Sequence, residues 1–170
     1  MKSFFGDSFR CFLCLCVSCW VAQLLVIGCT ILWHTNISVA AIHICACLIY
    51  WLVCTGALFL FAFRRGYLQD AAPMLQTLCT TMLALLCMLT LAILLNYIEF
   101  FSGGARDLAW LIAEFSGKHY VDLESIPNAE ILGAMFLYSA LYLPVPWLGR
   151  LCGRTFNHAK SRRFLRKQEK

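Results

Sequence analysis

The sequence predicts an all-α integral membrane protein, a bundle of four transmembrane helices with both termini in the cytoplasm. The chain of 170 residues is 61% hydrophobic, with a mean hydropathy of +0.74. A water-soluble domain of this size cannot bury so large an apolar share, because most of its residues lie at or near its surface. Four separate apolar runs are each longer than the roughly 20 residues that a helix needs to cross the hydrocarbon core.

The four runs cover residues 11–33, 39–63, 73–98 and 128–151, which together form a membrane domain over residues 11–152. The Arg64-Arg65 doublet ends the second run. Pro144 and Pro146 interrupt the fourth run near its end. Each proline inside a helix removes a backbone hydrogen bond, so we expect a kink or an early end there.

A signal peptide is the competing interpretation of the first run. Val26-Ile27-Gly28-Cys29 loosely matches the box before a lipid-modified cysteine. Cleavage there would leave three spans and a mature chain that starts at Cys29. The run is longer than the apolar core of a signal peptide, and no small-residue cleavage site follows it. We therefore expect the first helix to be retained.

The lysines and arginines set the orientation. All of them except Arg106 and Lys118 lie before the first run, directly after the second, or from Arg150 onward. The positive-inside rule then places residues 1–10, the Arg64 loop and the tail 153–170 in the cytoplasm, and residues 101–127 outside. We expect a bacterial cytoplasmic (inner) membrane, with a eukaryotic endomembrane or plasma membrane as the alternative.

The outer segment contains an amphipathic surface helix, expected over residues 105–116. Its apolar face has the i, i+3, i+4, i+7 spacing of a helix and consists of Leu108, Leu111, Ile112 and Phe115. Gly117 is well placed to end this helix. We expect the helix to lie on the outer membrane surface. A lid over the bundle is the favoured role, and a docking face for a partner is the alternative.

The basic tail predicts contact with the anionic inner leaflet. Juxtamembrane basic clusters attract anionic lipid with about 1 kcal/mol per Lys or Arg. Nucleic acid is not expected as a partner, since short basic tails after a last span commonly serve as topology anchors. The side chains expected to contact anionic lipid are Arg154, Lys160, Arg162, Arg163, Arg166 and Lys167.

The eleven cysteines all lie within or beside the apolar runs. An oxidising compartment would form disulfides in the outer segments, which contain no cysteine, so no disulfide framework is expected. Cys11-x-x-Cys14 and Cys16-x-x-Cys19 superficially resemble a zinc motif. On one helix these four thiols point in directions too different to converge on a single ion. We expect the cysteines to act as small packing residues, with no metal or cofactor.

Polar side chains gather near the ends of the runs. A candidate polar rim on the outer side consists of His43, Asn96, Glu99 and Glu130. Charged groups at such positions indicate function by default, although each can instead satisfy a hydrogen bond between helices. A second polar patch at the inner end of the third run consists of Gln76, Thr77, Thr80 and Thr81. Neither patch gives a continuous polar path across the bilayer.

A stripe of small residues on the fourth run, Ala129, Gly133 and Ala140, would permit close helix approach inside the bundle or with another chain.

No catalytic, metal-binding or nucleotide-binding motif is recognisable in the chain. We therefore interpret it as a non-enzymatic subunit that binds other membrane components, either a membrane protein or a second copy of itself. Its role would be of accessory, assembly or immunity type. In topology alone, and not in any motif, it resembles the tetraspan immunity proteins of bacteria. One alternative is a small oligomeric transporter or channel that uses the polar rim, and another is a membrane enzyme that uses intramembrane thiols.

Overall fold

The computed structural model describes residues 2–33, 38–68, 74–95, 104–120 and 122–168, with side chains at 4–32 and, in the later ranges, up to residue 159. These ranges form helices and one short 3-10 turn, and they contain no strand. The elements are α1 (Lys2–Trp33), α2 (Val39–Tyr67), α3 (Met74–Leu94), α5 (Ala105–Phe115), η1 (Leu123–Ser125), α6 (Asn128–Tyr142) and α7 (Pro144–Gln168).

Four helical segments among the described residues are long and apolar enough to cross a membrane. They are Phe4–Leu32, Val39–Tyr67, Met74–Leu94 and Asn128–Ala159, the last of which joins α6 to the first part of α7. The all-helical fold class and the four membrane-spanning candidates predicted from the sequence are thus confirmed, and they indicate a multi-pass membrane protein.

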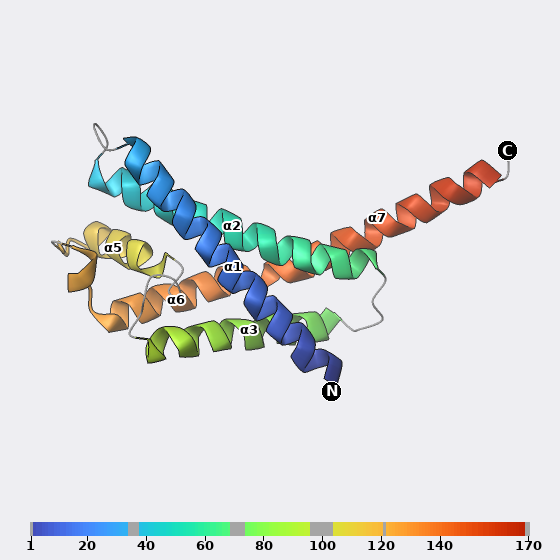
Figure 1. The fold of residues 1–170 in the computed structure, drawn as a ribbon, viewed down its shortest axis with the longest axis horizontal. Helices are drawn as coiled ribbons and strands as arrows, with labels where there is room; N and C mark the ends of the chain where they lie inside the picture. The colour runs from blue at the N-terminus through green and yellow to red at the C-terminus, as the bar shows by residue number, and fades with distance from the viewer. Residues whose placement is uncertain (1, 34–37, 69–73, 96–103, 121, 169–170) are drawn as a thin grey trace.

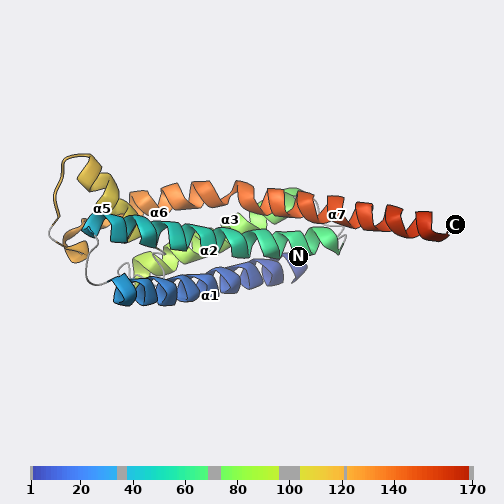
Figure 2. The ribbon, with the colours of Figure 1, turned by 90° about the horizontal axis from the view of Figure 1, so that it is seen from above.

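α2 and α7 lie side by side, α1 crosses the bundle obliquely and packs on α2 and α3, and α5 lies at one end (Figures 1 and 2). The most extensive packing is between α2 and α7, followed by α1 against α2 and α3. The start of α1, the end of α2 and the C-terminal part of α7 lie toward the opposite end from α5 (Figure 1). We call this the basic end, because it holds Arg10, Arg64 and Arg65, and we call the other the α5 end.

The helices extend beyond the apolar runs. α1 begins at Lys2, so the charged segment before the first run is already helical. α2 begins at Val39, where the Ser38 side chain accepts a hydrogen bond from the Ala41 amide, and it ends at Tyr67. Arg64 and Arg65 therefore lie in its last turn, where positive charge is favourable next to the unpaired carbonyl groups. Both ends of the predicted third run, residues 73 and 96–98, lie outside the described residues.

The fourth span is interrupted at Leu143, next to the two prolines. α6 ends at Tyr142, Leu143 keeps right-handed helical angles of φ −56° and ψ −43°, and α7 begins at Pro144. Both prolines thus occupy the first turn of α7, where a missing N–H costs little. The helix does not end early. It continues to Gln168 and projects beyond the other helices, so the basic tail is helical (Figure 2).

The α2–α7 interface is a contact of backbone against backbone. A Cβ atom added at Gly149 would lie 2.5 Å from the Phe59 carbonyl oxygen, and one at Gly153 would overlap the Phe63 carbonyl oxygen. From the other helix, a Cβ at Gly66 would overlap the Arg150 carbonyl oxygen. Gly149 and Gly153 have the small-xxx-small spacing that brings membrane helices close together.

The stripe of small residues on the fourth span lies on α6 and faces away from the bundle. Ala129, Gly133 and Ala140 are exposed, and a Cβ at Gly133 would meet no atom within 4 Å. Of the two contacts that the stripe would permit, the one inside the bundle is therefore not formed, and close approach of the fourth span occurs at the glycines of α7. Contact of the stripe with another chain stays a prediction.

Candidate binding sites at the two ends of the bundle

At the α5 end, a largely buried polar pair joins α5 to α2. Nδ1 of His43, in the second turn of α2, lies 2.7 Å from Oδ1 of Asp107, in the first turn of α5. The His43 ring also packs against the indole of Trp110, with ring centroids 4.4 Å apart. One side chain of the predicted polar rim is thereby used to hold α5 against the bundle.

Two glycines with positive φ fix the ends of α5. Gly104 precedes the helix with φ 78° and is covered by the ring of Tyr50, so any side chain there would be both strained and sterically blocked. Gly117 follows it with φ 78°, and its N–H donates to the Glu114 carbonyl while the Lys118 N–H donates to the Ala113 carbonyl. This is the Schellman arrangement, so the prediction that Gly117 ends the helix is confirmed.

Glu130, a second member of the predicted rim, has different partners. Its carboxylate accepts hydrogen bonds from Lys118 Nζ at 2.6 Å and from the Tyr120 hydroxyl at 3.0 Å. The hydrogen bond to the Glu130 carboxylate and its charge raise the pKa of Lys118. Asn96 and Glu99, the remaining members, lie outside the described residues. His43 and Glu130 thus each pair with a residue of the predicted outer segment.

The predicted apolar face of α5 is divided between two environments. Leu111 is buried and Leu108 is partly buried against the core, whereas Ile112 is 45% exposed and Phe115 is 84% exposed. The helix packs on α2 and α6 mainly through three alanines instead, Ala105, Ala109 and Ala113. Small side chains let the α5 backbone come close to its neighbours, and the bulky side chains near its C-terminal end are left outside.

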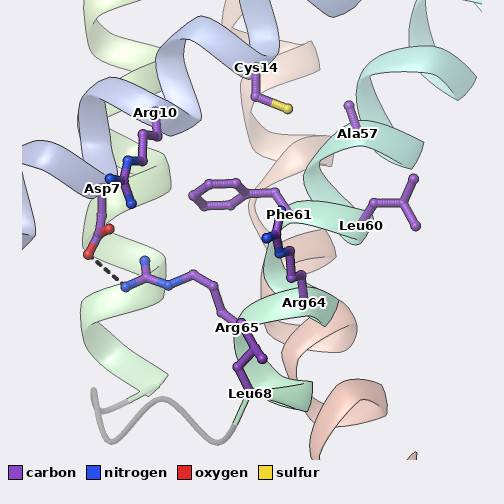
Figure 3. A pocket seen from close by; sticks show the side chains of 9 residues that line it. All are labelled: Asp7, Arg10, Cys14, Ala57, Leu60, Phe61, Arg64, Arg65 and Leu68. Carbon is purple, nitrogen blue, oxygen red and sulfur yellow. Dashed lines mark hydrogen bonds and ion pairs between the residues drawn. The ribbon is translucent and has the colours of Figure 1, made fainter.

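At the basic end, α1 and α2 enclose an open cavity of about 1010 Å³. Figure 3 shows Arg10 and Arg65 pointing into it from opposite helices. Nη2 of Arg65 lies 2.6 Å from Oδ2 of Asp7, and its guanidinium lies over the Phe61 ring at 5.9 Å. From the sequence, these arginines were used only to orient the chain in the membrane. Arg10 precedes the first span and Arg64-Arg65 follows the second, so their positions already indicate that they lie close together at one end of the bundle.

Arg150 is fully buried on the α3 side of α7, and its guanidinium donates a hydrogen bond to the Thr77 hydroxyl. Thr80 and Thr81 are also buried, and their hydroxyls donate to the Gln76 and Thr77 carbonyls of their own helix. The positively charged guanidinium of Arg150 on the fourth span therefore lies against the predicted polar patch of the third span. This contact ties α3 to α7 inside the bundle.

Some of the thiols lie at contacts between helices, whereas Cys79, Cys87 and Cys152 are exposed. Sγ of Cys19 lies 3.8 Å from Sγ of Cys54, and both residues are buried between α1 and α2. Cys16 contacts Met88 of α3, with its Sγ 3.6 Å from the methionine sulfur. Within the described ranges, no group of three or more His, Cys, Asp or Glu side chains is arranged to hold a metal ion.

The projecting part of α7 carries the predicted lipid-contacting tail. Phe156 anchors its base by packing on Phe63 and Tyr67 of α2, with ring centroids 6.2 and 6.5 Å apart. Asn157 adds a hydrogen bond from Nδ2 to the Tyr67 carbonyl at 2.6 Å. Arg154 is half-buried there. The side chains of the other predicted contacts, Lys160, Arg162, Arg163, Arg166 and Lys167, lie outside the described part.

Three surfaces are therefore available to partners: the outer end of α5, the cavity between α1 and α2, and the projecting part of α7. Comparison of the chain with known protein families, curated proteins and solved structures finds no match.

Proposed function

We propose that the protein is a membrane-integral subunit of accessory or assembly type, which binds another membrane protein and performs no chemistry of its own. The observation that carries this proposal is the exposed end of α5, where Phe115 is 84% and Ile112 is 45% exposed. α5 is not one of the four candidate spans, and we propose that these side chains face a membrane-protein partner rather than the lipid beside the bundle. Large apolar anchors of this kind dominate the binding energy of protein interfaces.

The way in which α5 is held supports docking. Gly104, the Schellman turn at Gly117 and the His43–Asp107 pair fix its two ends and one side. A helix that is already ordered pays little conformational entropy when a partner binds. The buried alanines and Leu111 serve the lid role expected from the sequence. Ile112 and Phe115 are left for the partner.

The orientation is part of the same proposal. The basic end carries Arg10, Arg64 and Arg65, whereas the acidic residues Asp107 and Glu114 lie on α5 and Asp122 follows it. By the positive-inside rule, both termini then face the cytoplasm and α5 faces the outside of a bacterial inner membrane. The partner would meet the protein at the outer side.

The two alternative functions make different demands. A transporter requires at least one member of the polar rim for activity, whereas His43 and Glu130 have internal partners in the bundle. A thiol enzyme requires at least one cysteine, whereas Cys19 and Cys54 are buried at a helix contact. The binding proposal requires neither, and it predicts that a variant with serine at every cysteine still binds its partner.

The test is to replace both exposed side chains, Ile112→Ser and Phe115→Ser, in the full chain. Tagged protein is purified from host membranes in mild detergent, and co-purifying proteins are quantified by mass spectrometry. Two anchors each worth more than about 1 kcal/mol predict at least a tenfold loss of a near-stoichiometric partner. The matched control is Phe136→Ser, 57% exposed on α6 within the fourth span, which should retain the partner. An unchanged set of co-purifying proteins in the α5 variant would contradict the proposal.

A further inference from the structure

The cavity between α1 and α2 has a surplus of positive charge. Its charged lining consists of Asp7, Arg10, Arg64 and Arg65, three positive groups and one negative. The mostly buried pair of Arg65 with Asp7 neutralises one positive charge. Arg10 and Arg64 are exposed, and no carboxylate of the described residues is recorded within ion-pair distance of either. Two guanidinium groups thus face the cavity with their charge uncompensated by these residues.

Most of the remaining lining is apolar and lies toward the middle of the span, apart from Leu68, which follows the arginines at the end of α2. Ala57 and Leu60 occupy the two turns of α2 that precede Arg64, and Leu60 is 66% exposed. In Figure 3 the Phe61 ring extends from α2 toward α1, beside the arginines. Inward of Leu68, a bound molecule would therefore meet guanidinium groups first and apolar side chains next.

A phospholipid has its charged and apolar parts in the same order. Its phosphate lies at the interface, and its acyl chains run into the hydrocarbon core. Arginine presents a planar set of donors that matches phosphate oxygens, and basic pockets between membrane helices bind anionic headgroups. A volume of about 1010 Å³ is sufficient for a headgroup and the start of its chains.

We propose that this cavity binds one anionic glycerophospholipid, with Arg10 and Arg64 on its phosphate and the Leu60 side of α2 along its acyl chain. The Asp7–Arg65 pair holds α1 and α2 at the separation that the headgroup needs. This site is separate from the surface expected for the basic tail, which lies on α7. A free phosphate ion offers the same oxygens but no acyl chain, so the two sources can be distinguished.

The test uses the full chain in nanodiscs that contain phosphatidylcholine and phosphatidylglycerol, followed by native mass spectrometry of the lipids that stay bound. The test variant is Arg10→Gln with Arg64→Gln, which leaves Arg65 and Asp7 paired. The matched control is Arg163→Gln with Arg166→Gln, which removes the same charge from the tail. Each basic group near the surface contributes about fivefold in affinity, so the cavity variant should lose about 30-fold in phosphatidylglycerol binding. The control should weaken only the loose contact of the tail with the anionic leaflet, and it should keep the single phosphatidylglycerol that the cavity holds.

Ala57→Phe provides a test without any change in charge, because it adds bulk to the lining of the cavity. It should also lower retention of phosphatidylglycerol. In every variant, oxidative cross-linking of Cys19 to Cys54 shows whether α1 and α2 are still paired. The proposal would be overturned if the cavity variants in which α1 and α2 still cross-link retained as much phosphatidylglycerol as the wild type. It would also be overturned if the wild type bound phosphatidylglycerol no better than phosphatidylcholine. Displacement of the lipid by excess inorganic phosphate would also overturn it in favour of a soluble anion.

Discussion

Gly66, Gly149 and Gly153 determine how closely α2 and α7 approach. Each one faces backbone atoms of the opposite helix at a distance that leaves no room for a Cβ atom. Carbonyl oxygens take up that space, and they cannot move without shifting a whole helix. The same approach positions the buried Arg150 side chain against Thr77. The absence of side chains at these three residues therefore sets the distance between α2 and α7, and with it the contact of α7 with α3.

Gly66→Ala should destabilise the bundle by about 1–3 kcal/mol, the usual cost of overpacking a close contact. The new methyl group would overlap the Arg150 carbonyl oxygen. Gly56→Ala is the matched control on the same helix, since a Cβ there meets no atom within 4 Å. That change should be neutral or should stabilise by up to about 1 kcal/mol through helix propensity. Thermal unfolding in detergent measures both, and equal unfolding temperatures for the two variants would contradict the interface.

Some of these residue roles could be read from the sequence and others could not. Gly117 could be predicted, because a glycine directly after an amphipathic run is a local signal for a helix end. Gly149 and Gly153 also form a local motif, but the α2 residues that they face, Phe59 and Phe63, are far away in the chain. The pairing of His43 with Asp107 depends on how α5 folds back on α2. Contacts between distant elements leave no periodic trace in one sequence.

At the scale of elements, α1 and α2 are held in one register. Cys19 and Cys54 meet at their contact in the middle of the spans. The Asp7–Arg65 pair fixes the same two helices at the basic end. One turn further toward the α5 end, the Tyr50 hydroxyl of α2 donates a hydrogen bond to the Gln23 side chain of α1. Three contacts along the pair leave little freedom for α1 to slide.

A chain that retains only Cys19 and Cys54, with serine at the other cysteines, should form a disulfide when oxidised with copper phenanthroline. The two thiols lose two hydrogens to the oxidant, and their present separation of 3.8 Å needs only a small adjustment of the side chains. Intact mass and loss of maleimide labelling after denaturation measure the product. A chain with only Cys29 and Cys54 is the control, since Cys29 lies about 15 Å further along α1. Cross-linking of the control pair at the same rate would refute this register.

The apolar runs predict the existence of the spans better than their ends. The ends of an apolar run mark where the side chains stop being suited to lipid. The end of a helix depends instead on where its backbone hydrogen bonds stop, and polar residues can continue those bonds. For this reason α1 starts at Lys2 and α7 reaches Gln168, well outside the runs. The face of α5 was also only partly predictable. Periodicity gives its apolar side, but the alanines that pack against α2 and α6 carry no strong hydropathy signal.

At the scale of the whole molecule, the apolar side chains point outward as well as inward. Large side chains such as Leu24, Leu52, Leu86 and Leu141 are exposed along all four spans. A bundle with so much apolar surface requires a bilayer around it. The two ends differ in chemistry: arginines line a cavity at one end, and acidic residues accompany a docked helix at the other. Both candidate binding sites therefore lie where the bundle meets water or headgroups.

The most direct test of this arrangement is to label engineered cysteines in a cysteine-free chain. Ser116→Cys marks the exposed end of α5, and Thr155→Cys marks the exposed side of α7 at the basic end. A membrane-impermeant maleimide added to intact cells should label position 116 at once and position 155 only after lysis. This result would place α5 outside and both termini inside. Labelling of position 155 in intact cells, or protection of position 116, would contradict the proposed orientation and the outer docking site that depends on it.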